Sequence, residues 1–330
     1  MLTTPLVDIP LIDFSPYLTN DVAGQQQVSK KIFKACHEIG FLYLTNHGIP
    51  QAAINQTFAQ SQAFFSLPEE EKTKIAWPNA LSNRGYIAIA RERLDITKPG
   101  DIKEAFNVGK EIPKERREAN QKDKELLVNR WPAEQDEFRQ TVMGFFDHCI
   151  ESADRIFRAF AIALSMPPNY IINHHKAHDY TMRLLHYPTP TMPPEPGQLW
   201  AGAHTDYGSI TLLFQDDAGG LEVKNKQGEW ISAPPVPGAV VVNIGDLLQR
   251  WSNDIFRSTE HRVKMIENTA PQTASQAALQ TERYSVVFFC QPDFKAEIAC
   301  MPTCQSENNP PKYPPIKSGE HLLSKLSATY

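Results

Sequence analysis

A histidine and an aspartate stand two residues apart in the segment Gly202-Ala-His-Thr-Asp-Tyr-Gly208. In a β-strand, residues i and i+2 point to the same face, so His204 and Asp206 would project together. A neutral imidazole and a carboxylate on one face supply two ligands of a facial triad, which leaves coordination positions open for exogenous ligands. Such a pair alone favours an ordinary surface or hydrogen-bonded pair over a metal site. A metal site therefore requires a third ligand elsewhere in the chain.

His261, within Ser258-Thr-Glu-His-Arg-Val263, is the best candidate for that ligand because it opens a second apolar strand far along the sequence. The segment Arg283-Tyr-Ser285 adds a guanidinium and a hydroxyl on one face of a further apolar strand. An inward arginine is costly unless its charge is matched. A bound carboxylate would match it through the two-pronged geometry that arginine favours, and a protein Asp or Glu is the alternative partner.

The composition is that of a globular chain with a sizeable core. Its 330 residues are enough for one large domain or two small ones. Hydrophobic residues make up 41 % and charged residues 22 %, and the mean hydropathy is -0.40, all near the averages for globular proteins. The net charge of -5 and the pI near 6.1 lack the basic surplus of a nucleic-acid binder, so we expect no nucleic-acid partner.

Neither a secretory signal nor a membrane span is expected. Residues 1–16 contain three prolines and two aspartates, unlike the charged start and apolar run of a signal peptide. No stretch approaches the ~20 apolar residues of a membrane span. The five cysteines, Cys36, Cys149, Cys290, Cys300 and Cys304, are scattered without CxxC spacing, which is typical of free thiols in a reducing compartment. We therefore expect a cytoplasmic protein without a membrane partner.

The patterning of apolar residues changes along the chain. Residues 21–38 and 50–75 have helical spacing on either side of an apolar strand at 40–44, and residues 133–166 predict a long amphipathic helix. After residue 180 the sequence consists of short β-branched and aromatic runs separated by turn residues, at 181–187, 209–214, 221–223, 239–244, 261–265 and 283–290. Such runs predict a β-sandwich or barrel rather than alternating βαβ units.

Taken together, the motifs resemble the iron(II)- and 2-oxoglutarate-dependent dioxygenases of the isopenicillin N synthase-like family. The resemblance covers nearly the whole chain, and it is specific because the motifs occur together and in this order. They are Ile9-Pro-Leu-Ile-Asp13, Gly40 to Ile49, Phe64 to Pro68, Arg183 to Pro188, His204 to Phe214, Gly219-Gly-Leu221, Asn243 to Asp246, His261-Arg-Val263, Arg283-Tyr-Ser285 and Leu326 to Tyr330.

The resemblance implies a mainly β fold with flanking helices, in which a double-stranded β-helix core, jelly-roll and cupin-like, carries an α/β N-terminal segment. Residues 1–125 would pack on the core, 126–180 would carry its supporting helix, 181–300 would form the catalytic core, and 301–330 would form a C-terminal loop and helix.

The same resemblance implies the roles of individual residues. His204, Asp206 and His261 would bind Fe(2+), which 2-oxoglutarate would chelate. The far carboxylate of 2-oxoglutarate would then meet Arg283 and Ser285. Tyr187 matches a family tyrosine that reaches this co-substrate, although the asparagine common two positions earlier is Leu185 here.

The implied activity is oxidation of a small organic molecule by O2, by default hydroxylation, coupled to decarboxylation of 2-oxoglutarate to succinate and CO2. Two alternatives remain open from the sequence. One is an iron oxidase of the same fold that uses no 2-oxoglutarate, as isopenicillin N synthase does, because Arg283 and Ser285 could bind a substrate carboxylate instead. The other is a non-catalytic cupin-like barrel in which His204 and Asp206 are ordinary polar wall residues.

The sequence does not identify the substrate. Tyr86 and Phe106 lie in segments that resemble parts of the family's pocket mouth, so both are expected to contact an organic substrate. Arg91 or Arg93 could meet an acidic one. The alternatives are core packing for the two aromatic residues and a solvated face for the two arginines.

The remaining histidines are given less specific roles. His47 belongs to the Asn-His-Gly-Ile turn and is expected to be structural. His174, His175 and His178 follow the end of the long helix in a polar stretch, which favours a solvated loop over a metal cluster. For His186, lining the site and simple packing remain equally open.

Overall fold

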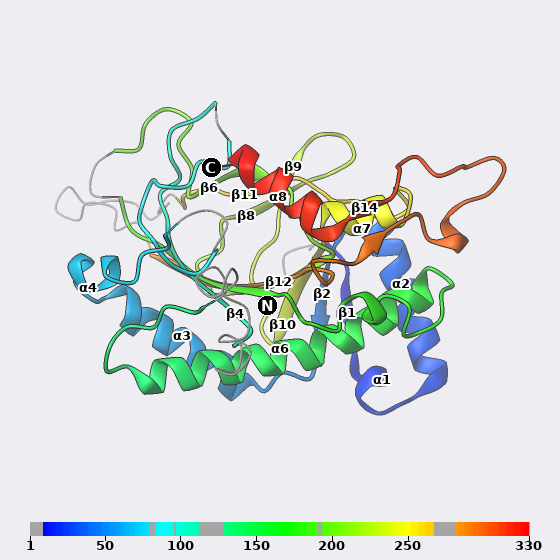
Figure 1. Cartoon of the computed structure of the whole chain (residues 1–330), viewed down its shortest axis with the longest axis horizontal. Coiled ribbons are helices and arrows are strands. Elements are labelled where there is room, and N and C mark those ends of the chain that lie inside the picture. Colours follow the sequence, from blue (N-terminus) through cyan, green and yellow to red (C-terminus); the bar gives the residue numbers. More distant parts are fainter. Residues whose placement is uncertain are drawn as a thin grey trace, which may run out of the picture.

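The computed structural model describes residues 9–78, 83–95, 97–111, 128–190, 193–266 and 282–329. Within these ranges the strands form two principal sheets and one short pair (Figure 1). The larger sheet contains, in spatial order, β1 (Leu11–Asp13), β2 (Phe41–Thr45), β10 (Ala239–Ile244), β7 (Ile210–Gln215), β12 (Arg283–Cys290), β5 (Thr181–Tyr187), β4 (Glu104–Gly109) and β3 (Gly85–Ile87). The smaller sheet contains β6 (Ala201–His204), β11 (His261–Val263), β8 (Leu221–Lys224) and β9 (Trp230–Ser232), and the short pair is β13 (Glu297–Ile298) with β14 (Ile316–Lys317).

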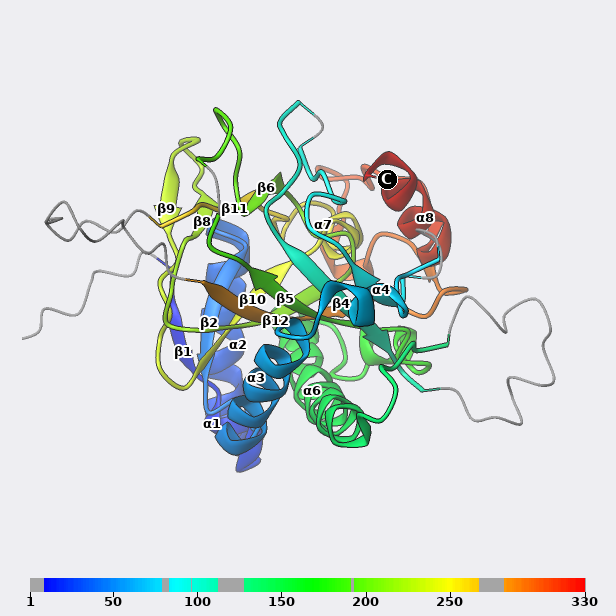
Figure 2. The same ribbon diagram turned by 90° about the vertical axis from the view of Figure 1, so that its left-hand side faces the viewer.

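Helices flank the larger sheet. They are α1 (Ser15–Leu18), α2 (Val22–Glu38), α3 (Gln51–Phe65), α4 (Glu69–Thr73), α6 (Asp136–Ala163), α7 (Asp246–Trp251) and α8 (Ser318–Thr329). In both views α3 and α6 lie on one side of the larger sheet, while β6, β8 and β11 lie on the other (Figures 1 and 2). This arrangement confirms the predicted mainly β fold with flanking helices around a jelly-roll core.

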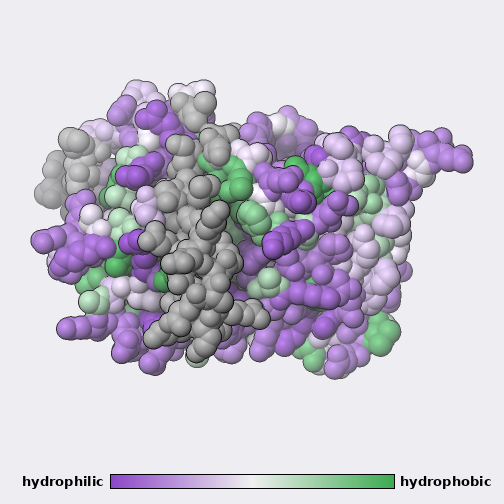
Figure 3. All heavy atoms as spheres, in the orientation of Figure 1, coloured by the Kyte–Doolittle hydropathy of each residue, from purple (hydrophilic) through white to green (hydrophobic). Residues whose placement is uncertain are grey.

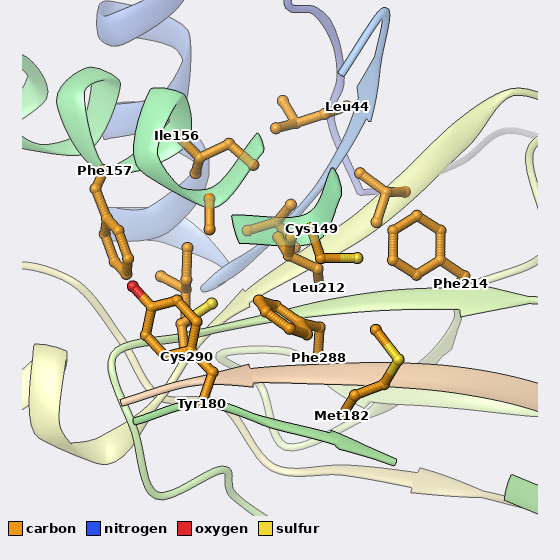
Figure 4. Packing of buried hydrophobic residues seen from close by; sticks show 14 of the residues in the cluster. Leu44, Cys149, Ile156, Phe157, Tyr180, Met182, Leu212, Phe214, Phe288 and Cys290 are labelled. Atoms are coloured by element: carbon orange, nitrogen blue, oxygen red, sulfur yellow. The ribbon is translucent and has the colours of Figure 1, made fainter. Parts of the chain in front are cut away.

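The central strands of the larger sheet are buried on both faces. On β12, the side chains of Tyr284, Val286 and Phe288 pack in the core beneath the sheet, with α3 and α6. The intervening Arg283, Val287 and Phe289 line a cavity on the opposite face. Figure 4 shows the helix side of this core, where Phe288, Cys290, Met182, Leu212 and Phe214 of the strands meet Cys149, Ile156 and Phe157 of α6. The period of two along each strand therefore separates core residues from cavity residues.

Helix α6 forms because its apolar residues recur every three or four positions, as Phe138, Val142, Phe145 and Cys149 do, and all of these are buried. Two acidic residues in its first turn favour the helix start. The helix ends where Ser165 adopts a φ of 57°, before two prolines. Its bounds confirm the helix predicted within residues 133–166.

The N-terminal part of the chain contributes both edges of the larger sheet. β1 and β2 form one edge, and β3 and β4, which were not predicted, form the other. The predicted helix at 21–38 is confirmed as α2, whereas the predicted helix at 50–75 is interrupted before Pro68 and becomes α3 and α4. The division at residues 125, 180 and 300 stays a prediction.

Gly40 makes the turn from α2 into β2 possible. Its φ is 81°, and a Cβ atom there would collide with the carbonyl oxygen of Arg257. The large apolar side chains that are exposed, such as Leu11, Val22 and Phe294, are scattered along the chain. The face shown in Figure 3 is mainly hydrophilic outside its grey atoms. Among the described helices, none combines the length and apolarity needed to cross a membrane.

Candidate metal and co-substrate site

The three predicted metal ligands meet at one end of the smaller sheet. His204 is the last residue of β6 and His261 the first of β11, and the two are paired across these antiparallel strands. Asp206 follows two residues after β6 ends. Its Oδ1 atom lies 4.0 Å from His204 Nε2 and 3.8 Å from His261 Nε2. One ligand atom from each residue lies within 4.8 Å of the others, so a single ion could be held by all three side chains.

A backbone carbonyl orients each imidazole. His204 Nδ1 donates to the oxygen of Gly202 over 2.8 Å, and His261 Nδ1 donates to that of Thr259 over 3.1 Å. Because a carbonyl can only accept, each neutral ring carries its proton on Nδ1 and keeps the Nε2 lone pair for a metal. Hydrogen bonds of this kind fix the tautomer and the orientation of metal-binding histidines.

The carboxylate of Asp206 is oriented by the larger sheet. Its Oδ2 atom accepts hydrogen bonds from Thr211 Oγ1 at 2.6 Å and from Asn243 Nδ2 at 2.7 Å. Thr211 lies on β7 and Asn243 on β10. The other oxygen, Oδ1, is the one nearest the two histidines. Both sheets therefore contribute to the cluster. The smaller sheet and the residues directly after β6 supply the ligands, and the larger sheet fixes the direction of the carboxylate.

The electrostatics of the cluster favour the state that a cation binds. Burial, and then the neighbouring His261, hold the pKa of His204 well below its usual value. Burial raises the pKa of Asp206, but the two imidazoles and the hydrogen bonds from Asn243 and Thr211 outweigh it, so that this pKa lies below its usual value. Near neutral pH His204 is therefore neutral and Asp206 is ionised. Two imidazole nitrogens and one carboxylate oxygen are a donor set that fits a non-haem iron(II) ion.

A cavity of about 120 Å³ opens beside these ligands, between the two sheets. Strands β5, β7, β10 and β12 of the larger sheet and β6, β8 and β11 of the smaller sheet contribute to its wall. Helix α8 adds Leu322 and Leu326. Apolar side chains, among them Leu213 and Val287, form much of the lining, which limits access of water to any ligand bound there.

Arg283 lies in this wall and is fully buried. It donates from Nε to the oxygen of Gly219 at 2.8 Å, from Nη1 to Ser285 Oγ at 3.2 Å and from Nη2 to Gln215 Oε1 at 3.3 Å. The ring of Tyr187 packs against it, with the centroid 4.7 Å from Cζ. These partners are all neutral, and no carboxylate in the described ranges forms an ion pair with Arg283. A buried guanidinium in this state fits an anionic ligand.

Two residues expected at the substrate face the opposite way. Tyr86 and Phe106 are paired across β3 and β4, and both lie in the core beneath the larger sheet. Phe106 stacks among aromatic side chains of α3 and α6, and neither residue lines the cavity. The expectation of substrate contact is therefore corrected. The reason is the alternation of the strand, which turns Phe106 to the helices and the adjacent Asn107 to the other face.

The other two residues expected at the substrate, Arg91 and Arg93, are exposed and are not part of the cavity wall. Glu92 between them is buried and does line the cavity, as do Lys103 and Arg183. These three residues were not predicted. A signal existed for Arg183, because alternation along residues 181–187 places it on the same face as Tyr187. No comparable signal marked Glu92 or Lys103.

The remaining histidines lie away from the ligand cluster. His47 is buried, and its Nδ1 accepts a hydrogen bond from the amide of Ile49, as expected for a structural turn. His186 packs instead of lining the cavity, because its ring stacks on Tyr284. His174 and His178 are partly exposed, but His175 is fully buried. The expected solvated loop is therefore wrong for His175, which the neighbouring core covers.

Comparison with known proteins identifies the family. Residues 9–134 match the family "non-haem dioxygenase in morphine synthesis N-terminal", and residues 178–292 match the 2OG-Fe(II) oxygenase superfamily. A 2-oxoglutarate-Fe(II) type oxidoreductase of Emericella nidulans is 33% identical over 326 residues, covering 97% of this chain and 90% of that protein. A homoarginine-6-hydroxylase of Glycine max is 34% identical over 344 residues, covering 100% of this chain and 99% of that protein.

A solved structure shows the same fold over nearly the whole chain. It is a full-length protein of Neurospora crassa in complex with alpha-KG (2-oxoglutarate) and thymine, with a TM-score of 0.84 at 39% identity, and the match covers 98% of this chain and 97% of that one. These relatives support the 2-oxoglutarate-dependent interpretation over the iron oxidase and the non-catalytic barrel. The predicted family, activity and cofactors are confirmed. This chain belongs to the 2OG-Fe(II) oxygenase superfamily and is an iron(II)- and 2-oxoglutarate-dependent dioxygenase.

Proposed function

We propose that His204, Asp206 and His261 hold the Fe(II) ion of this dioxygenase, and that the enzyme hydroxylates a carbon atom of a small organic molecule. When bound, Fe(II) and 2-oxoglutarate supply O2 activation coupled to oxidative decarboxylation of the keto acid to succinate and CO2. The proposal is supported above all by one observation. The three ligands and a buried arginine without a carboxylate partner in the described ranges share one cavity.

Arg283 and Ser285 would bind the far carboxylate of 2-oxoglutarate. The guanidinium offers a planar set of donors to a carboxylate, and the Ser285 hydroxyl, 3.2 Å from Nη1, lies on the same strand face. Tyr187 would support this end, because its ring packs against the guanidinium and limits the directions in which Arg283 can turn. The position two residues before Tyr187 is the apolar Leu185, which lines the cavity and offers no hydrogen bond to the co-substrate.

The chain's own residues would hold the reaction in a fixed geometry. His204 and His261 present Nε2 because their Nδ1 protons are bound to carbonyls, and Asp206 presents Oδ1 because Oδ2 is occupied. Fixed donors of this kind lower the cost of organising the site at the moment of reaction. The apolar lining would exclude water from the bound molecules. We infer that the substrate is a small molecule, as thymine is in the complex with the N. crassa protein.

The test is succinate formation from 2-oxoglutarate by the anaerobically iron-loaded protein after addition of O2. Wild type should form succinate even without substrate, slowly and uncoupled. His204→Ala should lose this activity together with stoichiometric Fe(II) binding. Arg283→Ala should keep Fe(II) binding but require about tenfold to a hundredfold more 2-oxoglutarate, because one charge-assisted contact is lost. Arg91→Ala, which removes an exposed arginine outside the cavity, is the matched control and should behave as wild type.

Each outcome has a distinct meaning. Loss of Fe(II) binding in His204→Ala, with an unchanged unfolding transition, would support the ligand assignment. An Arg283→Ala variant with the wild-type requirement for 2-oxoglutarate would overturn the co-substrate assignment alone. Wild-type Fe(II) binding by His204→Ala would overturn the proposed metal site.

We also propose that the enzyme acts in the reducing environment of the cytoplasm. All five cysteines are free thiols, and four of them are buried. Burial raises the pKa of the Cys36 and Cys149 thiols well above the usual value, so these thiols are weak nucleophiles. Subcellular fractionation of the source organism with an antibody against the chain is the direct test.

A further inference from the structure

The cavity contains two arginines in different electrostatic states. Arg283 has only neutral hydrogen-bond partners in the described ranges, as shown above. Arg183, by contrast, forms an ion pair with Glu92, with 2.8 Å between Nη1 and Oε1, and donates from Nε to Asn107 Oδ1 at 2.8 Å. The first arginine can accept a buried anion, while the charge of the second is already neutralised. The same cavity therefore offers two kinds of recognition, one of an anion by Arg283 and one by charged groups that are already paired with each other.

Lys103 belongs to the same group of paired charges as Arg183 and Glu92. Its ammonium group lies 3.2 Å from Glu92 Oε2 and 2.9 Å from Asp101 Oδ2, and its side chain is only 4% exposed. We call Glu92, Asp101, Lys103 and Arg183 the balanced cluster, because it holds two cations and two carboxylates. Asp101 Oδ1 also accepts the amide hydrogen of Gly202, two residues before His204. The cluster is thus attached to the strand that carries the first metal ligand.

The balanced cluster faces the cavity through Glu92, Lys103 and Arg183. An ammonium group has three donors, and that of Lys103 donates to Asp101 Oδ2 and forms an ion pair with Glu92 Oε2, which leaves at least one donor for a ligand. Burial lowers the pKa of Lys103, but Glu92 and Asp101 outweigh it and hold this pKa above its usual value, so the group stays charged. Leu94 and Leu326, on the same wall, are apolar.

A charged substrate would disturb this balance. A carboxylate placed here would find cations that are already paired, and an amine would find carboxylates that are already paired, so either would lose its hydration without a matching partner. A neutral dipole avoids that cost. A carbonyl oxygen can accept from Lys103 or Arg183, and an adjacent N–H can donate to a carboxylate oxygen of Glu92.

We infer that Glu92, Lys103 and Arg183 form the substrate-recognition wall, and that the substrate is an uncharged molecule with a carbonyl next to an N–H, as in a cyclic amide or imide. The inference rests on the proposed function, because it concerns the substrate of the same site. Glu92 and Lys103 would set specificity by contact with the substrate, while Asp101 would position Lys103.

The test compares matched ligands on the iron-loaded enzyme with 2-oxoglutarate. Uncharged 2-pyrrolidinone, succinimide and uracil form one set, small carboxylates of similar size a second, and small amines a third. Binding is measured by calorimetry without O2, and turnover is measured as substrate-stimulated O2 consumption with mass detection of an added oxygen atom. Wild type should bind the uncharged set most tightly and oxidise at least one of its members.

Two variants probe the charges of the wall. Lys103→Met should raise the KM for the uncharged substrate about tenfold to a hundredfold and leave the KM for the co-substrate nearly unchanged, because one charge-assisted hydrogen bond to the substrate is lost. The matched control is Lys98→Met, an exposed lysine nearby, which should change neither constant. Glu92→Gln keeps the shape of the side chain but leaves the cluster with one excess positive charge. In this variant, the affinity for the small carboxylates should rise relative to the affinity for the uncharged set.

The outcomes separate the inference from the proposed function. Absence of succinate from wild type under every condition would overturn the proposed function itself. Succinate formation with preferential binding of carboxylates or amines would overturn only the inference. The inference also fails if no uncharged amide binds, or if folded Glu92→Gln ranks the three sets as wild type does. A shift of Glu92→Gln toward carboxylates supports it, because a merely structural role of Glu92 would not change the sign of the preferred charge.

Discussion

At the residue scale, the metal cluster depends on atoms that do not themselves bind the metal. The carbonyls of Gly202 and Thr259 select the tautomer of the two histidines, and Thr211 with Asn243 selects the free oxygen of Asp206. These contacts restrict each ligand to one donor atom. Secondary contacts of this kind typically change metal affinity by about tenfold to a hundredfold.

Thr211→Val should weaken Fe(II) binding by about that factor, because valine keeps the shape of threonine but cannot donate to Asp206 Oδ2. Thr211→Ser retains the hydroxyl and should retain most of the affinity. Anaerobic calorimetric titration with Fe(II) measures both. Equal affinities of the valine and serine variants would show that the hydrogen bond does not orient the carboxylate.

His175 gives a prediction about stability and pH. It is fully buried, its Nδ1 donates to the oxygen of Ile171 at 2.9 Å, and its Nε2 lies 3.1 Å from Ser209 Oγ. Burial lowers its pKa from 6.5 to about 3, so below pH 6.5 the unfolded chain binds a proton that the folded chain does not. The contribution of neutral, buried His175 to the free energy of unfolding is fully present above pH 6.5. It decreases as the pH falls from 6.5 toward 3.

His175→Gln should remove this dependence. Between pH 7 and pH 5 the wild type should lose about 2 kcal/mol more of its free energy of unfolding than the variant does. Urea unfolding at the two pH values measures the difference, and the variant should start from a lower value at pH 7 because a packed ring is lost. An identical loss in both proteins would mean that His175 is protonated in the folded state.

At the scale of the elements, the bounds of the strands are easier to predict from the sequence than the surroundings of each strand face. β5, β10 and β12 have the predicted bounds, and β7, β8 and β11 differ from theirs by at most two residues at either end. His204 ends β6 and Asp206 lies beyond it, so the predicted strand alternation places only the first of these ligands within a strand. Segments with strong local patterning are predictable in this way because the period depends on neighbouring residues alone.

Helix α8 contributes to the wall of the cavity. Leu322 and Leu326 line it, and Lys325 forms an ion pair with Asp246, with 2.6 Å between Nζ and Oδ2. Asp246 in turn donates its amide hydrogen to the oxygen of Asp206 and accepts a hydrogen bond from Ser258 Oγ. The ion pair therefore joins the C-terminal helix to the segment that carries a metal ligand.

Lys325→Met should weaken this attachment of α8. Because the two side chains are 39% and 16% exposed, the free energy of unfolding should change by only about 0 to 1 kcal/mol. Catalysis should change more, with a higher KM for the substrate and more succinate formed per molecule of product. The exposed Lys317 provides the control variant Lys317→Met. If both variants couple succinate to product as wild type does, α8 keeps its place in the cavity wall without help from this ion pair.

At the scale of the whole molecule, two layers share the larger sheet. Its helix side is an aromatic core in which Phe288 packs edge to face with Phe146, at 5.0 Å between ring centroids, and with Tyr180 at 5.4 Å. Its other side forms the cavity wall. Stability and function are thus divided between the two faces of the same strands, so the core supports the geometry of the site.

Phe288→Ala should lower the free energy of unfolding by about 3 to 5 kcal/mol, because it leaves a cavity in a closely packed core. The half-exposed Phe294 gives a control, and Phe294→Ala should cost much less. Urea unfolding measures both, with Fe(II) affinity of the folded fraction as a second readout. A loss below about 1 kcal/mol for Phe288→Ala would indicate that the core repacks around the missing ring.

The sequence by itself determined the ligand types, the alternation of Arg283 with Ser285, most strands and the family. These features depend on residues close in the chain or on motifs in a set order. Only the tertiary structure decided which face of each strand meets the cavity, and it reversed the expectation for Tyr86 and Phe106. Both faces of the strands β4, β5 and β12 are buried, so polarity could not distinguish them. The balanced cluster likewise required folding, because backbone hydrogen bonds of residues 90 and 92 with Asp101 bring Glu92 near Lys103, and the pairing of β4 with β5 brings Arg183 to them.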